Sequence, residues 1–151
     1  MRLAEKQNST LNFLAELGDA QVAHGMLRRC VNSSRLNYMA RTTPCDATRE
    51  AATAFDRDAV EAFAAASRTP LTERQRLRAG FAVWDGGLGL RPIGDRVDAA
   101  YIASRAATHE LCRAISAAHS WNVDSPDDPL HEACVSRASY TATSTNSAKP
   151  S

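Results

Sequence analysis

The sequence predicts a mainly α-helical protein: a small irregular helical bundle, with a glycine-rich turn before a long helix and a disordered C-terminal tail. Several segments repeat apolar residues with the 3.6-residue period of an amphipathic helix. Hydrophobic residues make up 44% of the chain and aromatic residues only 6%, and much of the apolar content is alanine. This composition suits closely packed helices better than sheets of β-branched residues. From Ser136 onward the chain is rich in serine and threonine and has hardly any large apolar side chain, which predicts disorder.

The length of 151 residues favours a single domain. We expect a helical domain over residues 1–120, followed by a loop and a disordered tail over residues 121–151. The formal net charge is +1 and charged residues make up 23% of the chain. This is an ordinary composition, and it excludes a polybasic nucleic-acid tail or an acidic tail.

The first half of the chain contains the predicted helices that open the bundle. A short helical stripe ends at Gly18, and Asp19 then caps a second helix. The apolar residues that recur in these two helices are Leu11, Leu14, Leu17, Val22, Met26, Leu27, Cys30 and Val31. A short apolar patch follows at Leu36, Met39 and Ala40.

The clearest amphipathic helix comes next. Thr43 can serve as its N-cap, with Pro44 at the first helical position. Its apolar face consists of Ala51, Phe55, Ala59, Ala62, Phe63 and Ala66. The segment SRTP at residues 67–70 ends it.

The second half begins with a helix for which Thr72 and Gln75 have capping-box spacing. Residues 80–87 are predicted to be extended or irregular. The long helix starts after Pro92, and the residues expected on its inward face are Val97, Ala100, Tyr101, Thr108, Leu111, Ile115 and Ala118. A loop over residues 120–129 and one further turn complete the predicted elements.

Nothing in the sequence indicates secretion or a membrane. The first residues lack the apolar segment of a signal peptide. No apolar run approaches the roughly 20 residues that span a bilayer. The cysteines contain no C-x-x-C pair and are expected to be reduced thiols in the cytoplasm or nucleus; they are Cys30, Cys45, Cys112 and Cys134.

The stretch WDGGLGLRPIG, from Trp84 to Gly94, is rich in glycine but departs from two phosphate-binding templates. Pro92 stands where the dinucleotide fingerprint needs its third glycine, and Asp95 stands where a P-loop needs its lysine. We therefore predict a structural turn and no nucleotide cofactor. Its glycines would allow positive φ and close packing, and they are Gly86, Gly87 and Gly89. Side chains expected to pack around the turn are those of Trp84, Leu88 and Leu90.

The possible metal-binding and carboxylate patterns do not indicate a functional site. His109 with Cys112, and His131 with Cys134, form two H-x-x-C pairs, but their settings do not favour zinc, and we expect no metal site. The carboxylates of the FDRD segment, at residues 56 and 58, lie two apart on a predicted helix. They do not face each other, and we expect both to face solvent.

Arginines are locally dense and can neutralise phosphates. The candidate contacts to a nucleic-acid backbone are Arg28, Arg29, Arg35, Arg41 and Arg91. A second cluster flanks the helix that begins near Thr72 and consists of Arg68, Arg74, Arg76 and Arg78. A merely solvated basic face remains the alternative.

Three stretches together resemble a known family. They cover residues 17–44, 54–63 and 86–104. In order and spacing they are similar to the helical region that follows the polymerase palm in reverse-transcriptase-like proteins of non-LTR retrotransposons. The matching features are a Y-x-x-R-x-x-P stretch, an F-D helix, a GGLGLR turn and an AAY-x-A-S helix core. They fall here on Tyr38, Arg41, Pro44, Phe55, Asp56, Gly86–Arg91 and Ala99–Ser104.

The resemblance implies membership of an RNA-directed DNA polymerase family, whose catalytic unit carries two adjacent aspartates on a hairpin. Here Asp127 and Asp128 are adjacent, but they lie between Pro126 and Pro129 in a predicted loop. We therefore expect a non-catalytic fragment that scaffolds the polymerase portion or contacts the template–primer backbone weakly and without sequence preference. The alternative is a free-standing helical protein–protein interaction module.

Overall fold

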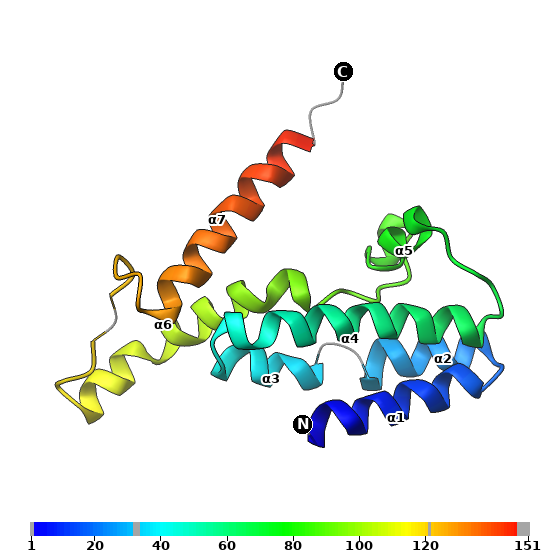
Figure 1. Cartoon of the computed structure of the whole chain (residues 1–151), viewed down its shortest axis with the longest axis horizontal. Coiled ribbons are helices and arrows are strands. Elements are labelled where there is room, and N and C mark those ends of the chain that lie inside the picture. Colours follow the sequence, from blue (N-terminus) through cyan, green and yellow to red (C-terminus); the bar gives the residue numbers. More distant parts are fainter. Residues whose placement is uncertain (1, 32–33, 121, 148–151) are drawn as a thin grey trace. The chain divides into compact units, whose positions relative to one another are not determined.

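The structure is a computed structural model that describes residues 2–31, 34–120 and 122–147 (Figure 1). Within these ranges it is helical and contains no strand, which confirms the mainly α fold class. The α-helices are α1 (Arg2–Glu16), α2 (Ala20–Met26), α3 (Ser34–Thr42), α4 (Cys45–Ala66), α5 (Glu73–Ala79), α6 (Val97–Ile115) and α7 (Pro129–Ser147). A π-helical turn, η1 (Leu27–Val31), and two 3₁₀ turns, η2 (Val83–Asp85) and η3 (Gly94–Arg96), complete the elements.

The chain forms two compact units. Unit 1 consists of Met1–Leu36 and Glu50–Gly94, and unit 2 consists of Asn37–Arg49 and Asp95–Ser151. Among the described residues, no helix is long and apolar enough to cross a membrane.

Small side chains let the helices of unit 1 pack closely. α1, α2 and α4 lie side by side (Figure 1), and their buried residues include many alanines. Those buried in this unit are Leu11, Leu14, Ala23, Leu27, Val31, Ala52, Phe55, Ala62, Ala64, Ala66, Ala79, Leu90 and Ile93. An alanine buries little apolar area, but its small side chain lets two helix backbones approach closely.

The predicted caps form in unit 1. The Asp19 carboxylate accepts hydrogen bonds from the backbone amides of Gln21 and Val22, at 2.9 and 3.0 Å, and so begins α2. At α5, Gln75 Oε1 accepts from the Thr72 backbone amide at 2.8 Å, which completes the expected capping box.

The inward face of α2 differs from the predicted one. Val22 and Cys30 are exposed, whereas Ala23, Leu27 and Val31 form the buried row. This row has the i, i+4, i+8 spacing of one helix face, and η1 continues it past the end of α2 with π-helical turns.

Unit 2 is built where the start of α6 meets α7 and the first turn of α4. Its buried apolar residues are Ala40, Cys45, Val97, Tyr101, Leu130 and Ala133. The buried Asp98 carboxylate accepts from both terminal nitrogens of Arg49, at 2.7 and 3.1 Å, and from the Ser136 hydroxyl at 2.9 Å. A buried charge needs such partners, and the hydrogen bond to Asp98 raises the pKa of Arg49.

The predicted inward face of α6 is only half correct. Val97 and Tyr101 are buried, but Leu111 is 63% exposed and Ile115 is 78% exposed. The side-chain partners that α7 supplies reach the beginning of α6, through Ser136 to Asp98 and Arg137 to the Asp95 carbonyl. Among the described residues of unit 2, the second half of the apolar stripe is therefore left exposed.

The tail also differs from the prediction of disorder from Ser136 onward, because α7 continues as a helix to Ser147. Its beginning is strongly fixed: Asp128 accepts from the Leu130 amide at 2.8 Å, and Leu130 and Ala133 are buried. Ser136 then bonds to Asp98. The last part of the predicted tail, 148–151, lies outside the described residues.

Candidate functional site: the glycine-rich turn

The glycine-rich turn, residues 80–94, is a tightly hydrogen-bonded reversal of the chain in unit 1. The Leu90 amide donates to the Ala79 carbonyl at 3.0 Å, and the Gly89 amide donates to the Phe81 carbonyl at 2.8 Å. Inside this closure, the Gly87 amide donates to the Ala82 carbonyl at 3.0 Å. The turn is thus a defined platform rather than a loose connection.

Its glycines are required for two different reasons. Gly86 and Gly89 have φ values of 76° and 70°, a region in which a β-carbon costs about 1–2 kcal/mol. Gly87 does not have a positive φ. A β-carbon there would lie 2.6 Å from the Arg78 carbonyl oxygen and closer still to that of Phe81. The sequence prediction of positive φ therefore does not apply to Gly87, which is needed for close backbone approach.

The end of the turn holds an anion that the protein itself supplies. The Asp56 carboxylate accepts hydrogen bonds from the backbone amides of Ile93 and Gly94, at 2.9 and 2.7 Å. A β-carbon on Gly94 would lie 3.1 Å from Thr53 Oγ1, so the glycine lets α4 approach. Asp56 was expected to face solvent, and this expectation is wrong because its partners lie on a distant segment of the chain. The amides that could have bound a phosphate are already used.

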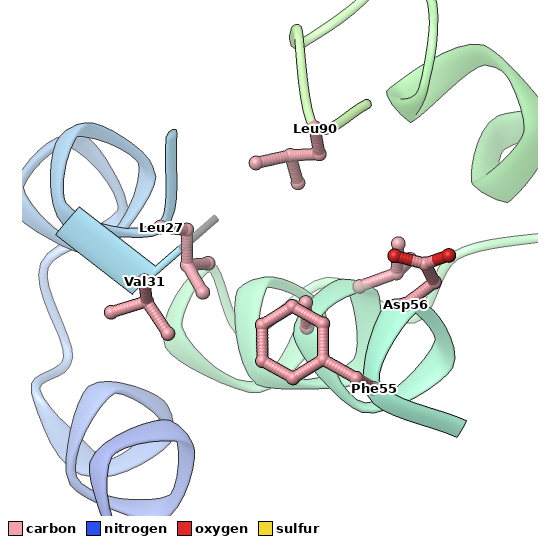
Figure 2. A pocket seen from close by; sticks show the side chains of 7 residues that line it. Leu27, Val31, Phe55, Asp56 and Leu90 are labelled. Carbon is pink, nitrogen blue, oxygen red and sulfur yellow. The ribbon is translucent and has the colours of Figure 1, made fainter. Parts of the chain in front are cut away.

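A second contact fastens the turn to α2. His24 Nε2 lies 2.6 Å from the Leu88 carbonyl oxygen, to which it donates a hydrogen bond. Leu90 points inward, toward Leu27, Val31 and Phe55 (Figure 2). The cavity between them has a volume of only about 10 Å³, which is about the space of one water molecule. The inner side of the turn is therefore packed and leaves no room for a ligand.

Three arginines from separate segments lie at this turn. A β-carbon on Gly89 would lie 3.1 Å from Arg28 Nε, so the Arg28 guanidinium rests against the turn. A β-carbon on Gly86 would lie 3.7 Å from a terminal nitrogen of Arg78. Residues 74–94 contain four arginines and one aspartate, and one of these arginines, Arg76, pairs with Glu61.

The Trp84 indole is the most exposed aromatic ring described, at 79%. The guanidinium carbon of Arg91 lies 5.7 Å from the ring centroid, within cation–π range. The prediction that Trp84 packs around the turn is wrong: of the three side chains expected to do so, Leu90 is buried, Leu88 is half-buried and Trp84 faces solvent. Trp84 lies on the 3₁₀ turn η2, and its exposure shows that the ring projects into solvent.

The other predicted backbone contacts belong to η1 and α3. Arg29 is exposed on η1, Arg41 belongs to unit 2, and the side chain of Arg35 lies outside the described residues. Arg78 was not among the predicted contacts. In the sequence, Arg78 stands out only as a member of the second arginine cluster. Its neighbour in space, Gly86, lies eight residues further on, so the sequence does not show that the two meet.

The histidines and Asp128 of these sequence patterns make contacts within unit 2. His131 Nδ1 donates to the Val123 carbonyl at 2.6 Å, and the rings of His109 and His119 lie 5.5 Å apart. Among the described residues, no group of three or more His, Cys, Asp or Glu side chains is arranged to hold a metal ion. Asp128 caps α7, and the amides of Leu130 and Asn122 that donate to its carboxylate lower its pKa.

Comparison with protein-family models, with curated proteins and with solved structures gave no match to this chain.

Proposed function

We propose that this chain is a helical, non-catalytic module of a reverse-transcriptase-like protein, and that it contacts a nucleic-acid backbone through the glycine-rich turn. The observation that carries the proposal is the gathering of Arg28, Arg78 and Arg91 at one turn, from three separate segments. Guanidinium groups suit phosphate contacts because they stay charged and donate several hydrogen bonds in a fixed plane.

The pairing of two motifs supports the family assignment. Phe55 and Asp56 form the F-D motif, and Gly86–Arg91 form the GGLGLR motif, which Ile93 and Gly94 follow closely. Asp56 binds the amides of Ile93 and Gly94, while Phe55 and Leu90 line the same small cavity. Motifs that contact each other in space have a reason to occur together in order and spacing.

The expected binding is weak and independent of sequence. Three phosphate contacts give a slope of log K against log salt of about −2 to −3, at affinities typical of non-specific binding, with Kd on the order of 10⁻⁴–10⁻⁶ M. The protein would add scaffold and backbone contacts to a polymerase portion that carries the catalytic aspartates.

Fluorescence anisotropy with a labelled oligonucleotide tests the proposal. The variant Arg28→Gln/Arg91→Gln removes two charges at the turn. The control Arg57→Gln/Arg113→Gln removes two exposed charges elsewhere, each from beside a carboxylate. We expect the first variant to weaken binding several-fold more than the control and to reduce the salt slope by about 2. Equal losses, or no binding at about 50 mM salt, would refute the proposal.

One observation favours a second candidate, a helical protein–protein interaction module. Leu111 and Ile115 lie four residues apart on α6, and both are exposed. Exposed apolar residues at this spacing suit a helix that packs on another helix. Sedimentation that shows self-association, lost in Ile115→Glu, would favour this candidate.

A further inference from the structure

We infer that the glycine-rich turn binds unpaired nucleotides, with the Trp84 ring as a stacking surface for a base and the neighbouring arginines as contacts for the flanking phosphates. This inference rests on the proposed function and specifies the class of nucleic acid as single-stranded. The site is the outer side of the turn, where Trp84, Arg28, Arg78 and Arg91 lie.

Trp84 contributes little to the packing of unit 1. It is 79% exposed, whereas the buried side of the same turn is supplied by Leu90 and Ile93. A tryptophan carries more apolar surface than other side chains, and burying its flat ring is strongly favourable. An exposed ring beside several cations therefore suits a ligand that has both a flat apolar face and negative charge.

The ring is held on a rigid support. Trp84 lies inside η2, where the Asp85 amide donates to the Ala82 carbonyl at 3.0 Å and the Gly86 amide donates to the Val83 carbonyl at 3.1 Å. The Arg91 guanidinium lies over the ring. Since the backbone is already fixed, binding need not order the turn, which lowers the cost of association.

The chemistry favours single strands over duplexes. In a duplex the faces of the bases are covered by their neighbours, so a protein ring reaches one only after unstacking it. In a single strand each base offers a free face, and base–aromatic stacking is tolerant of sequence. Backbone contacts from arginine are available with either form. Trp84 should therefore contribute to single-strand binding alone.

An acidic protein segment would meet the same charges, so it must be tested as a competitor. A nucleic acid is the better fit because it combines phosphates with flat π-faces, whereas an acidic peptide supplies carboxylates without such faces. A poly-glutamate peptide is the suitable probe.

The experiment measures binding of an oligo(dT) of about 12 nucleotides and of a duplex of equal length to the full chain. The variants are Trp84→Ala, Trp84→Phe, which keeps an aromatic face, and Phe13→Ala. Phe13 is a matched control because it is also aromatic, 60% exposed and in unit 1, on α1. In a Trp121→Phe background Trp84 is the single tryptophan, so quenching of its fluorescence reports stacking directly.

We expect Trp84→Ala to weaken oligo(dT) binding at least about fivefold and to leave duplex binding within about twofold. Trp84→Phe should restore most of the loss, and Phe13→Ala should change neither. Oligo(dT) should quench Trp84, and poly-glutamate should not.

The inference is overturned if Trp84→Ala weakens both forms equally, if oligo(dT) leaves Trp84 fluorescence unchanged, or if poly-glutamate competes as well as oligo(dT) at equal charge. If binding still depends on Arg28 and Arg91, these results reject stacking of a single strand on Trp84 but not the proposed contact with the nucleic-acid backbone. If neither nucleic acid binds, the proposed function fails as well.

Discussion

Replacing Gly87 with alanine places a methyl group against three backbone atoms. The new β-carbon would lie 2.5 Å from the Phe81 carbonyl carbon, 2.6 Å from the Arg78 carbonyl oxygen and closer still to the Phe81 oxygen. Backbone atoms cannot rotate away as a flexible side chain can. The backbone at Gly87 must therefore move away from the backbone at Arg78 and Phe81. This movement should break the hydrogen bond from the Gly89 amide to the Phe81 carbonyl, because the new β-carbon lies against that same carbonyl.

The cost follows from two terms. Overpacking costs about 1–3 kcal/mol, and a lost hydrogen bond adds about 0.5–1.5 kcal/mol. At about 2–4 °C per kcal/mol for a chain of this length, the Tm of Gly87→Ala should fall by roughly 3–18 °C. Gly89→Ala should cost about 1–2 kcal/mol, because its φ is positive but the nearest atom belongs to the movable side chain of Arg28.

Gly25→Ala is the matched control. Gly25 lies within α2 and has no atom within 4 Å of the position of a β-carbon. Alanine there should stabilise the helix by up to about 1 kcal/mol. Thermal unfolding followed by circular dichroism should therefore rank Gly87→Ala lowest and Gly25→Ala highest. A Gly87→Ala variant as stable as the parent would show that the turn does not have this tight backbone.

Three further predictions concern the polar groups. Asp56→Asn keeps one acceptor but loses the carboxylate shared by the amides of Ile93 and Gly94. Denaturant titration should show that the free energy of unfolding falls by about 1.5–3 kcal/mol, and an unchanged midpoint would contradict this role of Asp56. Burial, with Asp98 nearby, raises the pKa of the Cys45 thiol. At about pH 8 a disulfide reagent should therefore modify exposed Cys30 first and Cys45 only after unfolding. Modification of the two thiols at equal rates would contradict this. The pKa of Asp128 is lowered in the folded state, so its stabilising contribution is complete above the ordinary value of 3.8 and is lost as pH falls below it. In Asp128→Asn the free energy of unfolding should therefore fall less steeply as the pH is lowered below 3.8. An unchanged dependence on pH would contradict this.

Local signals carried most of the fold prediction. The caps at Asp19 and at Thr72 with Gln75 depend on residues two to three positions apart, and each forms as expected. The buried faces of α1 and α4 likewise follow from helical spacing, as Leu11, Leu14 and Phe55 show. Such features need no knowledge of tertiary structure.

The errors arose where distant segments decide the outcome. Leu111 and Ile115 continue the apolar rhythm of α6, but rhythm cannot tell how far along a helix its neighbours extend. Composition alone suggested disorder from Ser136 onward, but α7 continues past Ser136, whose hydroxyl bonds to the distant Asp98.

The candidate site was predictable only in part. Arg28 and Arg91 belonged to the predicted backbone contacts, and Gly86 and Gly89 to the predicted turn, but nothing local indicated that they meet. Arg78 joins them because the chain reverses between α5 and Leu90. Asp56 lies on an otherwise regular helix, and its partners are 37 and 38 residues away.

Photocrosslinking tests the central claim most directly. A short single-stranded RNA with 4-thiouridine is irradiated with the full chain, and the crosslinked tryptic peptides are identified by mass spectrometry. Cleavage after Arg78 and resistance of the Arg91–Pro92 bond place the turn itself, with Trp84 and Arg91, in one peptide, residues 79–96. We predict that this peptide carries the main crosslink, that Trp84 is the modified residue, and that the Arg28→Gln/Arg91→Gln variant loses it. Crosslinks that fall mainly on other peptides, or that persist unchanged in this variant, would contradict the assignment of nucleic-acid binding to the glycine-rich turn.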